Sequence, residues 1–141
     1  MFVNDKLEKY GKFELTHSDF GVRLTQVRSK IRELIEQYQI DEVVFEDVQL
    51  QENVQTFKQL AEVYGVIYEL VTELNLKNDA ILASSWKHTL GIKGKNRPEQ
   101  KRNAQQYIVN NYNIKPTQDE CDAICIGLHR IANSNPNDWT I

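Results

Sequence analysis

The sequence predicts an α/β fold in which a mixed β-sheet is flanked by helices, and three observations support this prediction. Short apolar runs that suit buried strands alternate with longer segments in which apolar residues recur every three or four positions, the period of an amphipathic helix. Two short strands separated by a turn come first, and the later strands alternate with helices. A β-β-α-β-α-β-α-α order favours a sheet with antiparallel and parallel pairs and with helices on its faces.

The N-terminal part is expected to form a hairpin, a helix and a buried strand. Phe2-Val3 and Leu7 to Leu15 supply the strand positions of the hairpin, and Asn4-Asp5-Lys6 supply its turn. Ser18-Asp19 are typical of a helix start, and the apolar period that follows predicts an amphipathic helix. Glu42 to Val48 is expected to be a buried strand.

The remaining elements are predicted from capping residues and from the apolar period. Asn53 suits a helix N-cap, Pro98 suits a first helical turn, and Thr117 with Glu120 forms a capping box. The predicted elements are a long helix after Asn53, a strand at Asp79–Ala83, a short helix or turn at Ser85–Leu90, a loop at Gly91–Asn96, a helix from Pro98 to about Asn111 and a last helix from Thr117 to about Ala132.

The composition is that of a globular protein. The 141 residues suit a single domain, with a polar tail from about residue 133 that is expected to be poorly ordered. No apolar run approaches the ~20 residues that span a membrane, and no signal peptide opens the chain. Cys121 and Cys125 show neither a disulfide framework nor a zinc spacing, and they are expected to be packing or surface thiols. A reduced, cytoplasmic location is therefore expected.

Basic residues are concentrated in one segment, although the formal net charge of the chain is −3. Glu99 is the only acid between residues 87 and 102. Taken alone, such a run is typical of a solvated surface. Beside a cluster of carboxylates it favours phosphate binding, because the acids need a metal ion and a phosphate substrate needs cations. The basic residues are Lys87, Lys93, Lys95, Arg97, Lys101 and Arg102.

Three acids are candidate metal ligands. Glu46 ends a predicted strand, and Asp119 and Asp122 lie one turn apart on one face of the last predicted helix. Each has a simpler interpretation, since helix-start acids complement the helix dipole and a strand-end acid can face solvent. Asp122, however, is at the edge of a buried face, where a carboxylate needs a partner or a metal. Asp47 is expected to point to the opposite side of the strand from Glu46.

The acidic motifs resemble those of the RuvC-like Holliday junction resolvases. Val44-Phe45-Glu46-Asp47-Val48-Gln49 is similar to the second acidic motif of that family, and Asp119-Glu120-Cys121-Asp122-Ala123-Ile124 is similar to its final motif. The segments between them also resemble the long helix, the glycine-lysine loop and the basic helix of the family. Their overall sequence pattern is similar to that of phage-type members. These segments are Leu60-Ala61-Glu62, Gly65-Val66-Ile67, Trp86-Lys87, Gly91, Lys93-Gly94-Lys95-Asn96-Arg97, Lys101 and Ala104.

The resemblance implies a ribonuclease H-like fold and a function in DNA recombination and repair. Members of the family act as homodimers that use Mg²⁺ or Mn²⁺ to cut four-way DNA junctions by symmetric nicks. The resemblance implies that Glu46, Asp119 and Asp122 are the catalytic metal ligands and that Lys101 stabilises charge on the scissile phosphate. The residues that would bind DNA are Lys87, Lys93, Lys95, Arg97, Lys101 and Arg102.

The resemblance also implies that one part of the family's site is absent. The family uses an aspartate in a first strand, and Phe2-Val3 resembles its second strand. The chain is therefore expected to be N-terminally truncated and impaired in cleavage. Asp5 lies in a turn and Asp19 at a helix start, so neither is expected to replace that aspartate.

Two alternatives to an endonuclease stay open. The first is a catalytically inactive protein that binds DNA junctions through the basic segment. The second is a dimeric interaction domain in which the acids are structural. Binding of a metal ion separates the endonuclease from the interaction domain, because three converging acids without metal would raise one another's pKa values.

Overall fold

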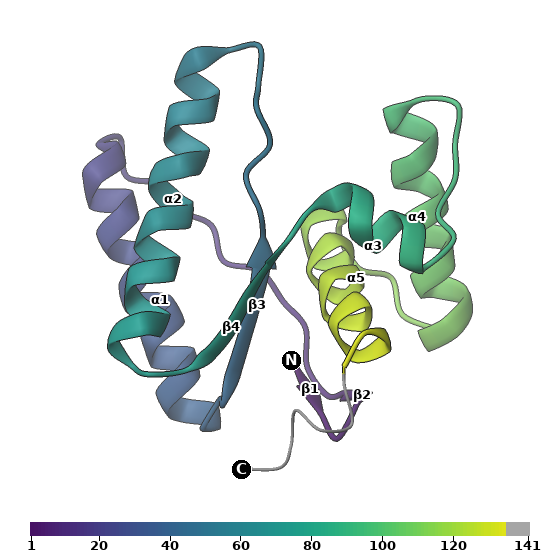
Figure 1. The fold of residues 1–141 in the computed structure, drawn as a ribbon, viewed down its shortest axis with the longest axis horizontal. Coiled ribbons are helices and arrows are strands. Elements are labelled where there is room, and N and C mark those ends of the chain that lie inside the picture. Colours follow the sequence, from purple (N-terminus) through teal and green to yellow (C-terminus); the bar gives the residue numbers. More distant parts are fainter. Residues whose placement is uncertain (135–141) are drawn as a thin grey trace. The chain divides into compact units, whose positions relative to one another are not determined.

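The computed structural model describes residues 1–134, so the predicted tail lies outside the described residues from 135 onward. Two compact units are formed: a terminal unit of Met1–Lys12 with the described residues from Ala83, and a central unit of Phe13–Leu82. The elements in chain order (Figure 1) are β1 (Phe2–Val3), β2 (Lys6–Leu7), α1 (Phe20–Tyr38), β3 (Glu42–Glu46), α2 (Val54–Glu73), β4 (Lys77–Ile81), α3 (Ala83–Thr89), α4 (Arg97–Tyr112) and α5 (Gln118–Ala132).

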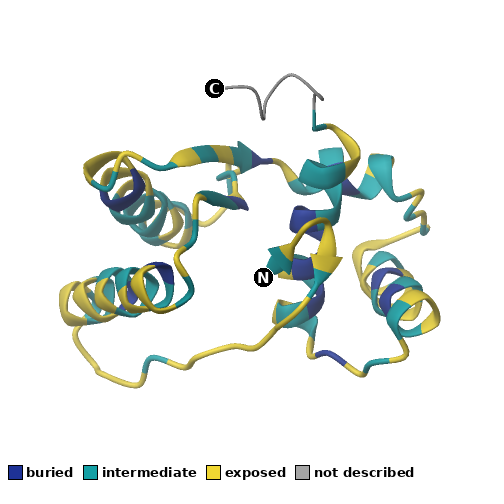
Figure 2. Ribbon diagram, turned by 90° about the horizontal axis from the view of Figure 1, so that it is seen from below, coloured by how far each residue is buried: buried dark blue, intermediate teal, exposed yellow. Residues whose placement is uncertain are grey.

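The central unit is built around a parallel strand pair that is joined through a helix. Strands β3 and β4 are parallel, with Glu42 opposite Lys77 and Glu46 opposite Ile81, and α2 makes the connection between them. Helices α1 and α2 pack against each other and bury apolar side chains (Figure 2). The Phe45 ring contacts Tyr64 of α2 edge-on, with ring centroids 5.3 Å apart, and this contact ties β3 to the helices.

The terminal unit is built around α5. Helices α3 and α4 both pack on α5, and Cys121 and Cys125 are fully buried free thiols within this core. This confirms that the cysteines are packing residues. Gly127 of α5 lies directly under the Phe2 ring, where a Cβ atom would collide with the ring. Strands β1 and β2 form a separate antiparallel pair.

The starts of α1, α2, α4 and α5 are confirmed, whereas α3 begins at Ala83 rather than Ser85 and the predicted second strand of the hairpin was wrong. Strand pairing ends at Leu7, and residues 8–17 have no regular structure. The antiparallel register places Leu7 opposite Phe2, and beyond this pair only Met1 bonds the returning chain, at Glu8 and Lys9. Smaller corrections apply to β3, which ends at Glu46, and to β4, which begins at Lys77. Within residues 1–134, no helix combines the length and apolarity that crossing a bilayer requires.

The start of α5 yields a prediction about stability. Thr117 is the N-cap residue of a complete capping box, so Thr117→Ala leaves the Glu120 backbone N–H without its side-chain acceptor. We expect a loss of about 1 kcal/mol in the free energy of unfolding, measured by chemical denaturation. Thr72→Ala serves as the control, because its hydroxyl binds a carbonyl inside α2 and alanine favours a helix interior. An equal loss in both variants would contradict a capping role.

Candidate functional site

The candidate site in the terminal unit begins at the N-terminus of α5. The Thr117 hydroxyl accepts from the Glu120 N–H at 3.4 Å, and the Glu120 carboxylate accepts from the Thr117 N–H at 2.9 Å. These bonds lower the pKa of Glu120, as expected for a carboxylate that caps a helix. The Glu120 carboxylate therefore forms part of the helix cap, which leaves Asp119 and Asp122 as the candidate ligands on this helix.

Asp122 is the carboxylate in this site with the most perturbed surroundings. It is half-buried, and the Gln118 side-chain amide donates to its Oδ1 at 2.8 Å. Burial raises the pKa of Asp122, and the nearby charge of Asp119 acts in the same direction. The hydrogen bond from Gln118 and the charges of Lys101 and Lys87 lower the pKa but do not outweigh burial. A bound cation would stabilise the ionised carboxylate further.

Two lysines from different helices lie within electrostatic reach of Asp122. Lys101 is an exposed residue of α4, and Lys87 is a half-buried residue of α3. The Lys87 ammonium donates to Gln100 Oε1 at 3.2 Å and lies 5.5 Å from the centroid of the Trp86 ring. The terminal unit therefore brings together the two predicted aspartates and two of the predicted basic residues.

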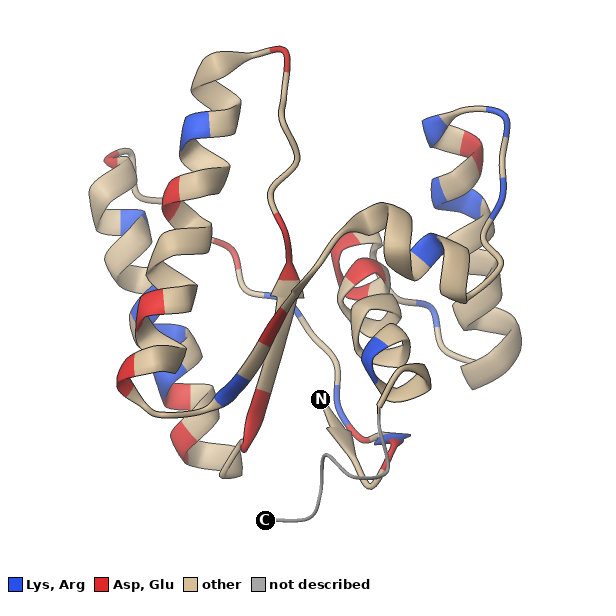
Figure 3. Cartoon of the chain, viewed as in Figure 1, with Lys and Arg blue, Asp and Glu red and all other residues tan. Residues whose placement is uncertain are grey.

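The other predicted DNA-binding residues surround the start of α4 (Figure 3). Within residues 1–134, none of them takes part in an ion pair. All are exposed, so their charges are available to an anionic partner. These residues are Lys93, Lys95, Arg97 and Arg102.

Glu46 belongs to the central unit, at the carboxyl end of β3. It is exposed, and strand alternation directs it away from the face on which Phe45 packs against α2. Asp47 lies outside β3 and accepts a hydrogen bond from the Val48 N–H at 2.8 Å. Among the described residues of either unit, no group of three or more His, Cys, Asp or Glu side chains is placed to hold a metal ion. The convergence of Glu46 with Asp119 and Asp122 on one ion therefore stays a prediction.

Two glutamines that contact the candidate site were not identified from the sequence. Gln118 is four residues before Asp122 on the same helix, and this spacing could have indicated the contact. Gln100 contacts Lys87 across 13 positions of sequence, and no sequence pattern indicates that contact.

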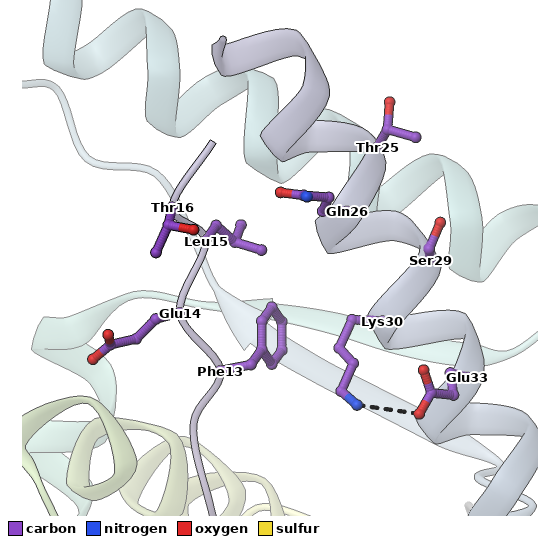
Figure 4. A pocket seen from close by; sticks show the side chains of 9 residues that line it. All are labelled: Phe13, Glu14, Leu15, Thr16, Thr25, Gln26, Ser29, Lys30 and Glu33. Carbon is purple, nitrogen blue, oxygen red and sulfur yellow. Dashed lines mark hydrogen bonds and ion pairs between the residues drawn. The ribbon is translucent and has the colours of Figure 1, made fainter. Parts of the chain in front are cut away.

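A surface cavity lies in the central unit, and none of the predicted catalytic or DNA-binding residues lines it. Its volume is about 380 Å³, and residues 13–16 and α1 line it (Figure 4). Lys30 and Glu33 at its edge form an ion pair of 3.1 Å with each other. The cavity contains none of the residues proposed from the sequence.

Comparisons with known proteins identify the family. The family model described as crossover junction endodeoxyribonuclease RuvC matches residues 6–130. T. thermophilus RuvC in complex with a Holliday junction substrate superposes with a TM-score of 0.69 at 11% identity, over 85% of this chain and 73% of that chain. A second structure of Thermus thermophilus RuvC superposes with a TM-score of 0.65 at 14% identity, over 82% of this chain and 69% of that chain.

The structural likeness and the family match agree. No curated protein sequence matches this chain significantly. The two solved structures share its fold, the α/β ribonuclease H-like fold that was predicted. Because the family model covers most of the sequence, the chain belongs to the RuvC family of crossover junction endodeoxyribonucleases.

Proposed function

We propose that this chain is a metal-dependent, structure-selective endonuclease that resolves four-way DNA junctions. The observation that carries the proposal is Asp122, a half-buried carboxylate one turn from Asp119 and within electrostatic reach of Lys101 and Lys87. Membership of the RuvC family supports the endodeoxyribonuclease activity. A carboxylate whose pKa is raised by burial suits the binding of a metal ion. The nearby lysines and the exposed basic residues of the loop Gly91–Asn96 suit the binding of a phosphate.

The chemistry of the acids fits a hard divalent cation, Mg²⁺ or Mn²⁺. Carboxylate oxygens are the preferred ligands of such ions, and Asp119, Asp122 and Glu46 would hold the ion. Bound there, it would supply an activated water and stabilise charge on the scissile phosphate. Lys101 would approach the same phosphate and stabilise its developing negative charge, an electrostatic role that needs no proton transfer.

The basic residues would hold the DNA backbone. Lys93, Lys95, Arg97 and Arg102 are exposed, with Lys87 and Lys101 closer to Asp122. Contacts of this type position a nucleic acid without reading its sequence. A four-way junction has two-fold symmetry, so we propose that a homodimer supplies the two sites that symmetric nicks require.

We propose that cleavage by this chain is slow. Two-ion phosphodiester hydrolysis uses cations about 4 Å apart, which clamp the attacking and leaving oxygens. Three carboxylates are enough for one hydrated ion, because Mg²⁺ usually takes one or two carboxylates with water and substrate as its other ligands. We assign none of these three acids to the position that bridges two ions, so we expect one bound ion and slow cleavage.

A second candidate function is junction binding without cleavage. The observation that favours it is that the whole basic segment lies within the terminal unit, whereas the three proposed metal ligands are divided between the two units. Binding could therefore persist where the metal site does not assemble.

Single-turnover cleavage of an end-labelled four-way junction tests the proposal. We expect slow, paired nicks with Mg²⁺ or Mn²⁺, none with a chelator, and none on a linear duplex of the same sequence. Junction binding in Ca²⁺, which is measured separately, reports affinity without turnover. Binding without nicks in any metal would favour the second candidate, and equal affinity for junction and linear DNA would contradict structure selectivity.

The dependence of junction binding on salt is a separate prediction. Because several basic side chains would displace counterions, the logarithm of affinity should fall steeply with the logarithm of salt concentration. Replacing Lys93 and Lys95 by alanine should flatten this slope by roughly one unit per lost contact. The control replaces Lys6 and Lys58, two exposed lysines outside the basic segment, and should leave the slope unchanged. A slope that does not respond to the Lys93 and Lys95 changes would remove this loop from the DNA interface.

A further inference from the structure

The loop Gly91–Asn96, called the basic loop here, is bound through its backbone to α4 at three consecutive residues. The Asn103 side-chain amide donates to the Lys93 carbonyl at 2.6 Å, and the Gln100 amide donates to the Gly94 carbonyl at 3.3 Å. The Lys95 N–H donates to the Glu99 carboxylate at 2.8 Å. The loop is therefore docked on the helix, and its lysine side chains project from a backbone that is already ordered before DNA binds.

Gly94 is required by the closeness of this docking. A Cβ atom at residue 94 would lie 2.8 Å from the Gln100 backbone nitrogen and 2.9 Å from Gln100 Cγ. Real Cβ atoms do not approach a backbone atom that closely, so any larger residue would push the loop away from α4. Glycine serves here to permit close approach of two backbone segments.

Gln100 also binds Lys87 with the other end of its amide. Its Oε1 accepts from the Lys87 ammonium at 3.2 Å, while its Nε2 donates to the Gly94 carbonyl. A side-chain amide offers both an acceptor and a donor, whereas a carboxylate has no donor and an ammonium has no acceptor. Gln100 thus joins α3, the basic loop and α4 at one point.

We propose that Gln100 is a positioning residue for the cleavage reaction, which holds Lys87 beside Asp122 and holds the basic loop on α4 at the same time. This inference rests on the proposed endonuclease function. The consequence is a fixed spacing between the Lys87 ammonium near Asp122 and the loop lysines that would contact the DNA backbone. A misplaced lysine costs rate even where DNA still binds, because transition-state stabilisation depends on geometry.

Gln100→Met tests the inference, because methionine keeps the side-chain length and loses both hydrogen bonds. At saturating protein, we expect the single-turnover rate to fall about tenfold, and the junction Kd to change by a smaller factor. Gln106→Met is the matched control. It lies on the same helix and loses a 2.6 Å bond to Asn110, and its rate should stay at the level of the unmodified chain. A change in Kd without a change in rate would overturn the positioning role.

A double-mutant cycle with Lys87→Met shows whether Gln100 acts through Lys87. We expect Gln100→Met to slow the unmodified chain but to add little in the Lys87→Met background, since the group that it positions is then gone. Rate effects that multiply fully in the double variant would overturn the proposed route. Gly94→Ala should also release the loop from α4, because its Cβ atom would collide with Gln100, and it should slow cleavage as well as raise Kd.

Hydrogen exchange in the DNA-free protein separates this inference from the proposed function. The Lys95 amide should exchange faster in Gln100→Met than in the unmodified chain or in Gln106→Met, because the loop leaves α4. An unmodified chain that does not cleave would contradict the proposed function, and unchanged exchange of Lys95 would contradict the docking by Gln100. Faster exchange with an unchanged cleavage rate would overturn the link between docking and reaction.

Discussion

Asp122→Asn is expected to lower the single-turnover rate of junction cleavage by at least about two orders of magnitude, each tenfold step being ~1.4 kcal/mol of transition-state stabilisation. Asparagine has the shape of aspartate, and its amide oxygen can still accept from Gln118. What the substitution removes is the negative charge that would bind the cation. The loss therefore reports on metal binding and not on a damaged helix.

The same substitution is expected to raise the stability of the metal-free protein at neutral pH. Burial raises the pKa of Asp122 above its unfolded value, so its favourable contribution is fully present below the unfolded pKa and is lost as pH rises through the folded pKa. At neutral pH the ionised, half-buried carboxylate opposes folding, and asparagine removes that cost. A gain in stability with a loss of activity is typical of functional sites.

Thermal unfolding with and without Mg²⁺ or Mn²⁺ measures both effects. The Tm of the unmodified chain should rise with metal concentration, because the ion binds the folded state, whereas the Tm of Asp122→Asn should not respond. Asp41→Asn, at an exposed aspartate outside the site, should keep the full response to metal. A metal response that persists in Asp122→Asn would show that the ion binds elsewhere.

Glu46→Gln is expected to abolish cleavage to a similar extent, although Glu46 and the two aspartates belong to different units. If the three carboxylates share one ion, removing any one of them disables the same site. The double variant Glu46→Gln with Asp122→Asn should then cleave no more slowly than the slower single variant, since residues that act as a unit are not additive. The rise of Tm with metal should disappear in Glu46→Gln as well.

Asp47→Asn is the matched control for Glu46→Gln. Asp47 is the next residue, and its carboxylate accepts from the Val48 N–H, a bond that asparagine can keep. Its cleavage rate and metal response should stay near those of the unmodified chain. Equal losses at residues 46 and 47 would indicate damage to the end of β3 rather than removal of a ligand. Rate losses that multiply in the double variant would mean that Glu46 and Asp122 act at separate places.

Features that depend on neighbouring residues alone could be predicted from the sequence. Asp19, Asn53 and Thr117 each accept a hydrogen bond from an N–H three residues further on, so their side chains mark the starts of α1, α2 and α5 without help from the rest of the fold. The acidic motifs around Glu46 and Asp122 likewise lie within short segments, and they led to the family that the comparison confirmed.

Features that depend on distant partners were decided by the tertiary structure. The second hairpin strand was predicted to reach Leu15 but ends at Leu7, because a strand extends only as far as it pairs with a partner strand, and β2 pairs with Phe2–Val3 alone. The role of Gln100 depends on Lys87 being carried to it by a different helix, and the half-burial of Asp122 depends on the packing of α3 and α4 against α5. The sequence thus determined which residues carry charge and where helices begin. Packing decided which of those charges lie together, because hydrogen bonds and desolvation act through space and not along the chain.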